Sequence, residues 1–199
     1  MDSFEREARL SGHRFVAGVD EAGRGPLAGP VVAAAVIFKT PPLNLGIKDS
    51  KLLTPGARER IALDIHSYAL SIGVGIVWPD AIDGMNIHRA SLKAMEVAVN
   101  ALAPLPDILL IDGPWTIDAL SLAQRPIISG DSLSVTIGAA SIIAKTTRDG
   151  IMRAYHTIYP EYNFVKNKGY PTGEHISVLE AIGPCPIHRK TFSFRRGRL

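Results

Sequence analysis

The feature that most constrains the fold of this 199-residue chain is an unbroken apolar run over residues 31–38. Its valine and isoleucine residues favour a β-strand. The run is far shorter than the roughly 18 apolar residues that a membrane span needs. A second strand is expected over 15–19, joined to the first by a glycine-rich turn. These residues therefore predict a buried sheet in a globular protein.

The rest of the chain alternates between strand and helix patterns. Further strands are expected over 71–78, 107–112 and 126–129, and helices over 54–68, 87–102, 132–158 and 172–182. No internal repeat and no Ser- or Gln-rich linker divides the chain. We therefore predict one α/β domain over 1–199: a mixed central sheet flanked by helices, with a helical, basic C-terminal part from about 160 to 199.

Composition excludes several classes of protein. Hydrophobic residues make up 46% and charged residues 21%, which is enough for a core and excludes intrinsic disorder. The first ten residues alternate charges and lack the apolar core of a signal peptide. The single cysteine, Cys185, cannot form an internal disulfide or a thiolate metal cluster. We expect a soluble, cytoplasmic protein, and nothing in the sequence requires more than a monomer.

Charge is unevenly distributed along the chain. Residues 1–149 carry 14 basic and 16 acidic side chains, whereas residues 150–199 carry 8 and 3. The last eleven residues contain no acid and five basic side chains: Arg189, Lys190, Arg195, Arg196 and Arg198. This asymmetry indicates a polyanionic partner, or else a solvated basic tail.

Carboxylates stand at the ends of predicted apolar strands, where they are rare. Asp20 and Glu21 follow the strand at 15–19, Asp112 ends the strand at 107–112, and Asp131 precedes the long helix. Ligands of α/β sheets collect outside strand ends, so these acids are expected to converge. Carboxylates that converge repel one another, and a hard divalent cation relieves the repulsion. Oxygen ligands favour Mg²⁺ or Mn²⁺, and two such ions can promote phosphoryl transfer.

Each acid also has a structural interpretation. Asp131 can cap the following helix, and Asp112 before Gly113 can be a turn residue. Asp20 and Glu21 face opposite ways on a regular strand, so one of them is structural unless the strand bends there. Asp149 is expected to pair with Arg153, one helical turn on.

Several polar groups are candidates for contacts with a nucleic acid. The loop Gly23-Arg24-Gly25 can bring backbone amides close to a phosphate or sugar. Its glycine spacing and the strand after it exclude a dinucleotide-binding motif. Tyr170 stands among cations, which suits stacking on a sugar or base, although a role in the core is the alternative. Candidate phosphate contacts are Ser50, Lys51, Lys145, Thr146, Arg148 and Lys168.

Together, these segments resemble one family, the bacterial ribonuclease HII enzymes. The resemblance rests on Val19-Asp20-Glu21-Ala22-Gly23-Arg24-Gly25-Pro26, Asp49-Ser50-Lys51, Ile111-Asp112-Gly113, Gly130-Asp131-Ser132, the block from Ala139 to Asp149, and Lys168-Gly169-Tyr170-Pro171. These blocks span most of the chain in the order that the family has. Only about a dozen residues precede the first predicted strand, unlike the related ribonuclease HIII type, which carries an additional N-terminal domain.

The resemblance implies a ribonuclease H-like fold and an endonuclease that cuts the RNA strand of RNA–DNA hybrids and single ribonucleotides in duplex DNA. It implies that Asp20, Glu21, Asp112 and Asp131 are the catalytic acids, with Mn²⁺ or Mg²⁺ as cofactor. Gly23, Arg24 and Gly25 match the loop that reads the 2′-hydroxyl, and Tyr170 matches the tyrosine at the RNA–DNA junction. Two alternatives are a non-catalytic hybrid-binding module and a metal-dependent phosphotransferase with a small substrate.

Overall fold

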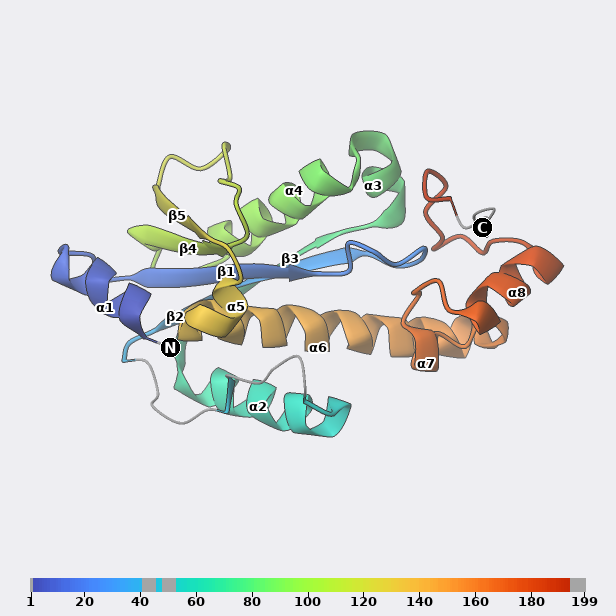
Figure 1. Cartoon of the computed structure of the whole chain (residues 1–199), viewed down its shortest axis with the longest axis horizontal. Helices are drawn as coiled ribbons and strands as arrows, with labels where there is room; N and C mark the ends of the chain where they lie inside the picture. The colour runs from blue at the N-terminus through green and yellow to red at the C-terminus, as the bar shows by residue number, and fades with distance from the viewer. Residues whose placement is uncertain (1, 41–45, 48–52, 194–199) are drawn as a thin grey trace.

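The computed structural model describes residues 2–40, 46–47 and 53–193. Its centre is a five-stranded mixed sheet in the order β3-β2-β1-β4-β5 (Figure 1). The strands are β1 (Val16–Ala22), β2 (Val31–Phe38), β3 (Ala69–Val77), β4 (Ile108–Asp112) and β5 (Ala123–Ile127). β1 pairs antiparallel with β2 and parallel with β4, and β4 pairs parallel with β5. β1 is therefore the central strand.

Helices cover both faces of this sheet. They are α1 (Ser3–Leu10), α2 (Pro55–Tyr68), α3 (Pro79–Met85), α4 (Ile87–Asn100), α5 (Gly130–Leu133), α6 (Val135–Ile158), α7 (Phe164–Asn167) and α8 (Gly173–Ile182), with a 3-10 turn η2 (Pro160–Tyr162). α4 lies on one face and α6 on the other, with α2 outside α6 (Figure 1). This arrangement confirms the predicted mixed sheet with flanking helices. Within the described ranges, none of the helices combines the length and hydropathy of a membrane crossing.

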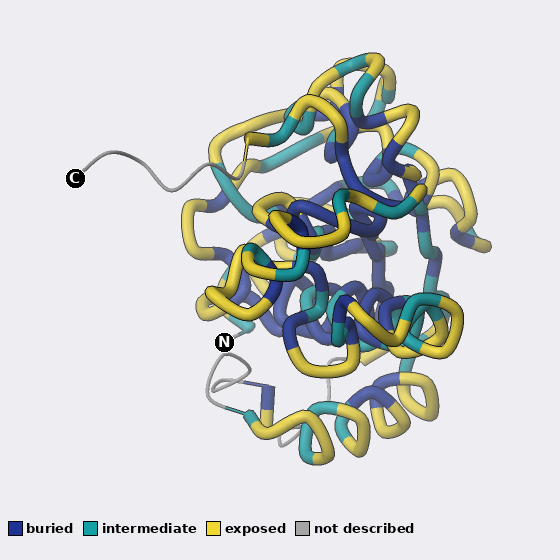
Figure 2. Tube along the Cα trace, turned by 90° about the vertical axis from the view of Figure 1, so that its right-hand side faces the viewer, coloured by how far each residue is buried: buried dark blue, intermediate teal, exposed yellow. Residues whose placement is uncertain are grey.

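The apolar run becomes β2, and every one of its residues is buried. Alternate side chains serve two cores: Ala33, Ala35 and Ile37 pack beneath α4, whereas Ala34 and Val36 pack beneath α6. The outer surface of α2 is exposed, while the sheet forms the buried interior (Figure 2). A strand without polar positions is stable here because both of its faces are covered.

Some predicted boundaries are wrong. The fifth strand was expected over 126–129, but β5 is Ala123–Ile127. β5 is an edge strand that begins with Ala123, Gln124 and Arg125, so no apolar pattern marks its start. The side chain of Gln124 is hydrogen-bonded to the backbone of Ile117 and Leu120. The helix expected over 132–158 is interrupted at Ser134, which is extended and separates α5 from α6.

Helix α1, which the sequence did not reveal, is anchored by one buried carboxylate. Glu5 is 1% exposed and accepts hydrogen bonds from the backbone N–H of Thr136 (3.0 Å) and the hydroxyls of Thr136 (2.8 Å) and Ser134 (2.5 Å). Ser134 in turn caps α6, because its Oγ accepts from the N–H of Ile137 at 3.2 Å. Glu5 thus places a negative charge at the positive end of α6.

We expect Glu5→Ala to lower the free energy of unfolding by about 2–3 kcal/mol, because three buried donors lose a charged acceptor. Urea unfolding measures the change. Glu7→Ala is the matched control, since Glu7 lies on the same helix and makes only an exposed ion pair with Arg125 in the described part of the chain. Equal effects of the two substitutions would contradict the anchoring role.

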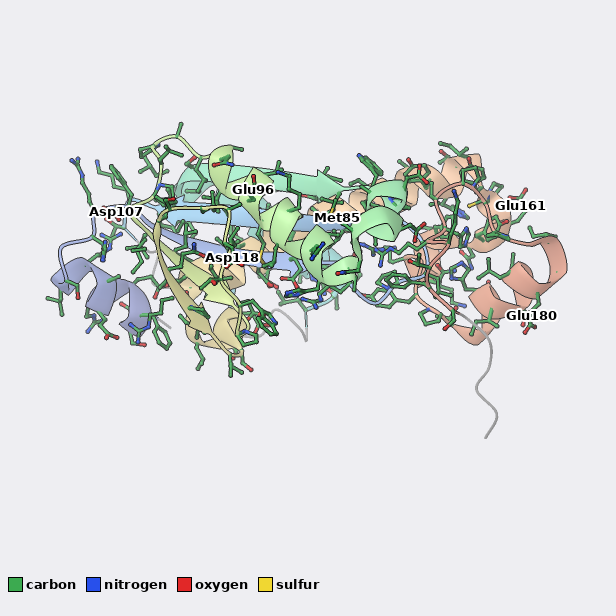
Figure 3. All side chains as sticks on the ribbon, turned by 90° about the horizontal axis from the view of Figure 1, so that it is seen from above. Met85, Glu96, Asp107, Asp118, Glu161 and Glu180 are labelled. Atoms are coloured by element: carbon green, nitrogen blue, oxygen red, sulfur yellow. The ribbon has the colours of Figure 1, made fainter. Side chains whose placement is uncertain are left out.

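The C-terminal segments gather at the far end of α6 and have a small core of their own. Phe164, Leu179 and Ile187 pack there against Leu27 and Met152. Seen from above, Glu161 and Glu180 lie at this end, whereas Asp107 and Asp118 lie toward the opposite end, where α1 is (Figure 3). The glycine-rich turn that contains Leu27 is thereby fixed to the C-terminal part of the chain.

Candidate active site

The parallel pairing of β1 with β4 brings two of the predicted acids together. Val19 lies opposite Ile111 in this register, so the next residues, Asp20 near the end of β1 and Asp112 at the end of β4, lie at the same level. The backbone N–H of Asp131, in α5, points to Oδ1 of Asp112 at 3.4 Å. Asp20 and Asp112 therefore lie on neighbouring strands at one end of the sheet, as the strand-end argument predicted, and the backbone of Asp131 lies against Asp112.

Asp20 and Glu21 face opposite sides of the sheet, and β1 continues beyond them to Ala22. Asp20 is 5% exposed and accepts hydrogen bonds from the N–H of Glu21 (2.7 Å) and from the side chain of Ser141 on α6. Glu21 forms an ion pair with Arg24 at 3.1 Å. Each acid thus has polar partners of its own on its side of β1.

The charge of Asp112 opposes the ionisation of both Asp20 and Glu21. Burial raises the pKa of Asp20 well above its usual value, and the charges of Glu21 and Asp112 raise it further. Burial also raises the pKa of Glu21, although Arg24 opposes the rise. Carboxylates in such a position are stabilised by a cation.

The donor chemistry fits Mg²⁺ or Mn²⁺, because every candidate ligand is a carboxylate oxygen. In the described part of the chain, however, no three His, Cys, Asp or Glu side chains already stand in a metal-ligating group. The four carboxylates would have to move closer together to bind one ion jointly.

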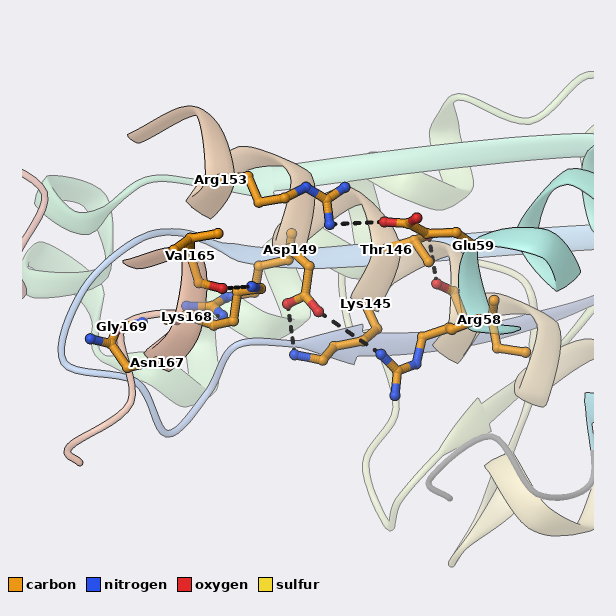
Figure 4. Close-up of polar contacts among 12 residues, drawn as sticks. Arg58, Glu59, Lys145, Thr146, Asp149, Arg153, Val165, Asn167, Lys168 and Gly169 are labelled. Atoms are coloured by element: carbon orange, nitrogen blue, oxygen red, sulfur yellow. Dashed lines mark hydrogen bonds and ion pairs between the residues drawn. The ribbon is translucent and has the colours of Figure 1, made fainter. Parts of the chain in front are cut away.

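The alternative interpretations have mixed outcomes. Ser134, and not Asp131, caps α6, and Asp131 is the second residue of α5. The predicted Asp149–Arg153 pair is wrong: Asp149 contacts Lys145 at 2.7 Å and Arg58 at 4.0 Å, whereas Arg153 contacts Glu59 (Figure 4). Arg58 comes from α2, a neighbour that helical spacing alone does not reveal.

A cleft of about 430 Å³ lies beside the acids and contains much of the predicted substrate site. Its walls include Glu21, Gly23, Arg24, Gly25, Arg58, Ser141, Lys145 and Tyr170. A Cβ at Gly25 would lie 3.8 Å from Cε1 of Tyr170, so the loop and the tyrosine ring are close despite 145 residues of separation. A second cleft of about 260 Å³ shares Glu21 and Arg24 and extends to Asp112, His88 and Trp115.

The side chains predicted to contact phosphate differ in the interactions that they already make within the protein. Lys145 pairs with Asp149, and its Nζ lies 5.8 Å from the centre of the Tyr170 ring. The hydroxyl of Thr146 donates to carbonyls of its own helix, and Lys168 donates to the carbonyl of Val165 (Figure 4). Ser50 and Lys51 lie outside the described residues.

Arg148 does not fit the predicted contact with a phosphate. It is completely buried, and its guanidinium donates to the carbonyls of Ala28, Pro30 and Lys168. Arg189, counted with the basic tail, is only 3% exposed. A count of charges along the sequence cannot distinguish such buried cations from basic side chains on the surface.

A pair of histidines, which the sequence analysis did not identify as part of the site, supports the backbone of Tyr170. Nδ1 of His188 contacts the N–H of Cys185 at 3.0 Å, and its Nε2 lies 3.0 Å from Nε2 of His175. Nδ1 of His175 lies 2.9 Å from the carbonyl of Tyr170. With both rings neutral, the chain of donors is consistent: Cys185 to His188, His188 to His175, and His175 to Tyr170.

This pair predicts a loss of stability in mild acid. Burial lowers the pKa of His188 to about 4, and burial lowers that of His175 as well. The unfolded chain takes up a proton below about pH 6.5 that the folded chain does not. The contribution to stability is therefore complete above pH 6.5 and is lost as the pH falls toward 4, by about 3 kcal/mol for His188.

Urea unfolding at pH 7 and pH 4.5 measures this loss. His188→Gln should weaken the dependence on pH, whereas His66→Gln, at an exposed position on α2, should leave it as in the wild type. An unchanged dependence in His188→Gln would show that other groups cause the acid sensitivity.

Comparisons with known proteins identify the family of this chain. The family model described as Ribonuclease HII matches residues 17–195. The chain belongs to the ribonuclease HII family. It is 53% identical to Ribonuclease HII of Syntrophus aciditrophicus (strain SB), over 98% of this chain and 92% of that protein. It is 51% identical to Ribonuclease HII of Bacillus subtilis (strain 168), over 97% of this chain and 75% of that protein.

A solved structure agrees with this identification. The crystal structure of ribonuclease H2 from Pyrococcus horikoshii OT3 matches with a TM-score of 0.78 and 29% identity, over 90% of this chain and 94% of that one. The predicted ribonuclease H-like fold is thus confirmed. As a member of the ribonuclease HII family, the chain is a metal-dependent endoribonuclease that acts on RNA paired with DNA.

Proposed function

We propose that this ribonuclease HII cuts the RNA strand of RNA–DNA hybrids and also incises on the 5′ side of a single ribonucleotide in duplex DNA, leaving 3′-hydroxyl and 5′-phosphate ends. The observation that carries the proposal is the cleft in which Gly23–Gly25 and Tyr170 lie beside Glu21, one of the four candidate acids. A site that recognises one ribose beside a reaction centre can act on an isolated ribonucleotide. The monomeric state and cytoplasmic location expected from the sequence stay predictions.

Asp20, Glu21, Asp112 and Asp131 are the residues that would hold Mn²⁺ or Mg²⁺. The bound cation would supply positive charge beside the scissile phosphate and lower the pKa of the attacking water. Ser141 donates to Asp20 and orients that carboxylate. The reaction needs no covalent enzyme intermediate, because water attacks the phosphorus directly.

Discrimination between RNA and DNA requires contact with the 2′-hydroxyl. Arg24 and Gly25 are exposed and line the cleft, and Tyr170, 40% exposed, can pack against a sugar there. The Arg24–Glu21 ion pair links this loop to the acidic edge. Ribose recognition and phosphate cleavage would thus be adjacent.

The decisive experiment uses duplex DNA with one ribonucleotide, with Mn²⁺ or Mg²⁺, and maps the cut. Incision on the 5′ side of the ribonucleotide, abolished by a chelator, is the expected result. Cleavage of long hybrids without this incision would remove the junction-reading role of Gly23–Gly25. Binding without cleavage of either substrate at any divalent ion would favour a hybrid-binding module instead.

A further inference from the structure

The exposed loop at the cleft is attached to the protein by two buried arginines that the proposed chemistry does not use. Arg148 of α6 donates from Nε to the carbonyl of Pro30 (2.9 Å), from Nη1 to that of Lys168 (3.0 Å), and from Nη2 to that of Ala28 (3.0 Å). It therefore joins the segment after the Gly23–Gly25 loop to the turn just before Tyr170.

Arg189 holds the loop itself. Its Nη2 donates to the carbonyl of Gly23 (2.5 Å), its Nη1 to that of Arg24 (2.9 Å), and both Nε (3.1 Å) and Nη2 (2.9 Å) to that of Gly29. Gly23 has φ +99°, and a Cβ there would lie 2.2 Å from Nε of Arg148. The loop can approach the guanidinium groups so closely only because this residue is glycine.

Backbone hydrogen bonds complete the attachment. The N–H of Leu27 donates to the carbonyl of Gly169 at 2.8 Å, and the N–H of Arg189 donates to the carbonyl of Leu27 at 2.8 Å. Leu27, two residues after the loop, thus joins the turn before Tyr170 to the segment that carries Arg189.

Two neighbouring buried cations are a costly way to fill a core. Burial, together with the charge of Arg148, lowers the pKa of Arg189 to about 9. The hydrogen bonds that the two guanidinium groups donate within the described residues all end on backbone carbonyls. Such an arrangement fixes a backbone path, since the planar donors of arginine impose distance and direction on each carbonyl.

We propose that Arg148 and Arg189 are positioning residues that hold the Gly23–Gly25 loop at a fixed distance from Tyr170, and thereby set the selectivity of the enzyme for a single ribonucleotide. They act through backbone carbonyls and need no contact with the nucleic acid. The inference rests on the proposed role of the loop and of Tyr170 in reading the ribonucleotide junction.

Arg189→Lys is the most informative variant, because it keeps the positive charge and loses the planar set of donors. We expect kcat/KM for a duplex with one ribonucleotide to fall about tenfold or more, which corresponds to about 1.4 kcal/mol of transition-state stabilisation. For a long RNA–DNA hybrid we expect kcat/KM to change by less than about threefold, because the enzyme can bind productively at many positions along the hybrid. Arg153→Lys, on the exposed side of α6, is the matched control and should change neither value.

A cycle with Arg24→Ala separates positioning from a general loss of structure. If Arg189 acts through the loop, the double variant loses less single-ribonucleotide activity than the product of the two single losses. Circular dichroism and urea unfolding establish that each variant is folded at the assay temperature. If the loss of single-ribonucleotide activity in the double variant equals the product of the two single losses, the proposal is overturned.

A measurement on the wild type keeps the proposal testable if Arg189→Lys does not fold. The Nε–H protons of Arg148 and Arg189 should exchange slowly with solvent in NMR spectra. Rapid exchange of either proton would contradict the positioning role of these two arginines. The outcomes also separate this inference from the proposed function. Wild-type enzyme that cuts hybrids but not single ribonucleotides would contradict the proposed function. The inference alone would be contradicted by a different set of results. In that case the wild type incises at a single ribonucleotide and Arg24→Ala is impaired in this incision, but Arg189→Lys is folded and as selective as the wild type.

Discussion

Asp20→Asn is expected to lower the rate of hybrid cleavage by about 1000-fold or more and, at the same time, to increase the stability of the protein. The loss of rate follows from the place of Asp20 near the end of the central strand, beside Asp112 and bonded to Ser141. The substitution preserves size and removes only the charge. Binding of the hybrid should persist, because the cleft residues of the loop and Tyr170 are unchanged.

The gain in stability follows from the direction of the pKa shift of Asp20. Because burial and nearby carboxylates raise its pKa in the folded state, ionisation of Asp20 weakens folding as the pH rises above the unfolded value of 3.8. At pH 8 without divalent ions, the wild type bears this cost and the asparagine variant does not.

Urea unfolding in chelator and a cleavage assay with Mn²⁺ measure the two effects of Asp20→Asn. Asp64→Asn, at an exposed position of α2, should alter neither. A variant with undiminished activity in a clean preparation would remove Asp20 from the catalytic group. Lower stability of the variant in chelator would show that its hydrogen bonds outweigh the repulsion.

The sequence predicts the parts of this fold in which local pattern and burial agree. β1, β2 and β4 follow from apolar runs, and the start of α2 follows from Thr54, whose Oγ accepts from the N–H of Ala57. The acids at the strand ends can be predicted in the same way, because a carboxylate directly after a buried apolar run is unusual. β5 and α1 were missed or misplaced because their stability comes from distant partners, such as the contacts of Glu5 with Thr136.

The less visible parts of the site depend on which distant segments meet. Ser141 is one small polar residue in an apolar helix, and only the fold places it against Asp20. Arg189 has the same charge in the sequence as its neighbour Lys190, yet one is buried against Gly23 and the other is exposed. The path of the chain between β1 and the C-terminal part decides this difference, and no local pattern records it.

Gly18→Ala is expected to lower the free energy of unfolding by about 4 kcal/mol. Gly18 lies in the middle of β1, where a Cβ would stand 2.1 Å from the carbonyl carbon of Thr136 and 2.2 Å from the backbone nitrogen of Ile137. Both atoms belong to the first turn of α6, so no side-chain rotation can relieve the overlap.

The helix would have to move away from the sheet, and Gly18→Ala should therefore reduce activity as well as stability. α6 carries Ser141, which contacts Asp20, Lys145, which lines the cleft, and Arg148, which donates to the carbonyl of Ala28 after the Gly23–Gly25 loop. Urea unfolding and single-ribonucleotide incision at a temperature where the variant is folded measure the two losses.

Gly56→Ala is the matched control for Gly18→Ala, because a Cβ there meets nothing within 4 Å and the residue lies in α2, where alanine is the better helix former. It should raise stability by up to about 1 kcal/mol. A Gly18→Ala variant within about 0.5 kcal/mol of the wild type would mean that α6 and β1 separate easily. If stability fell but the folded variant incised normally, the shift of α6 would be confined to its first turn. In that case the close approach at Gly18 would serve the core, and the contacts from Ser141 onward would be sufficient to position the site.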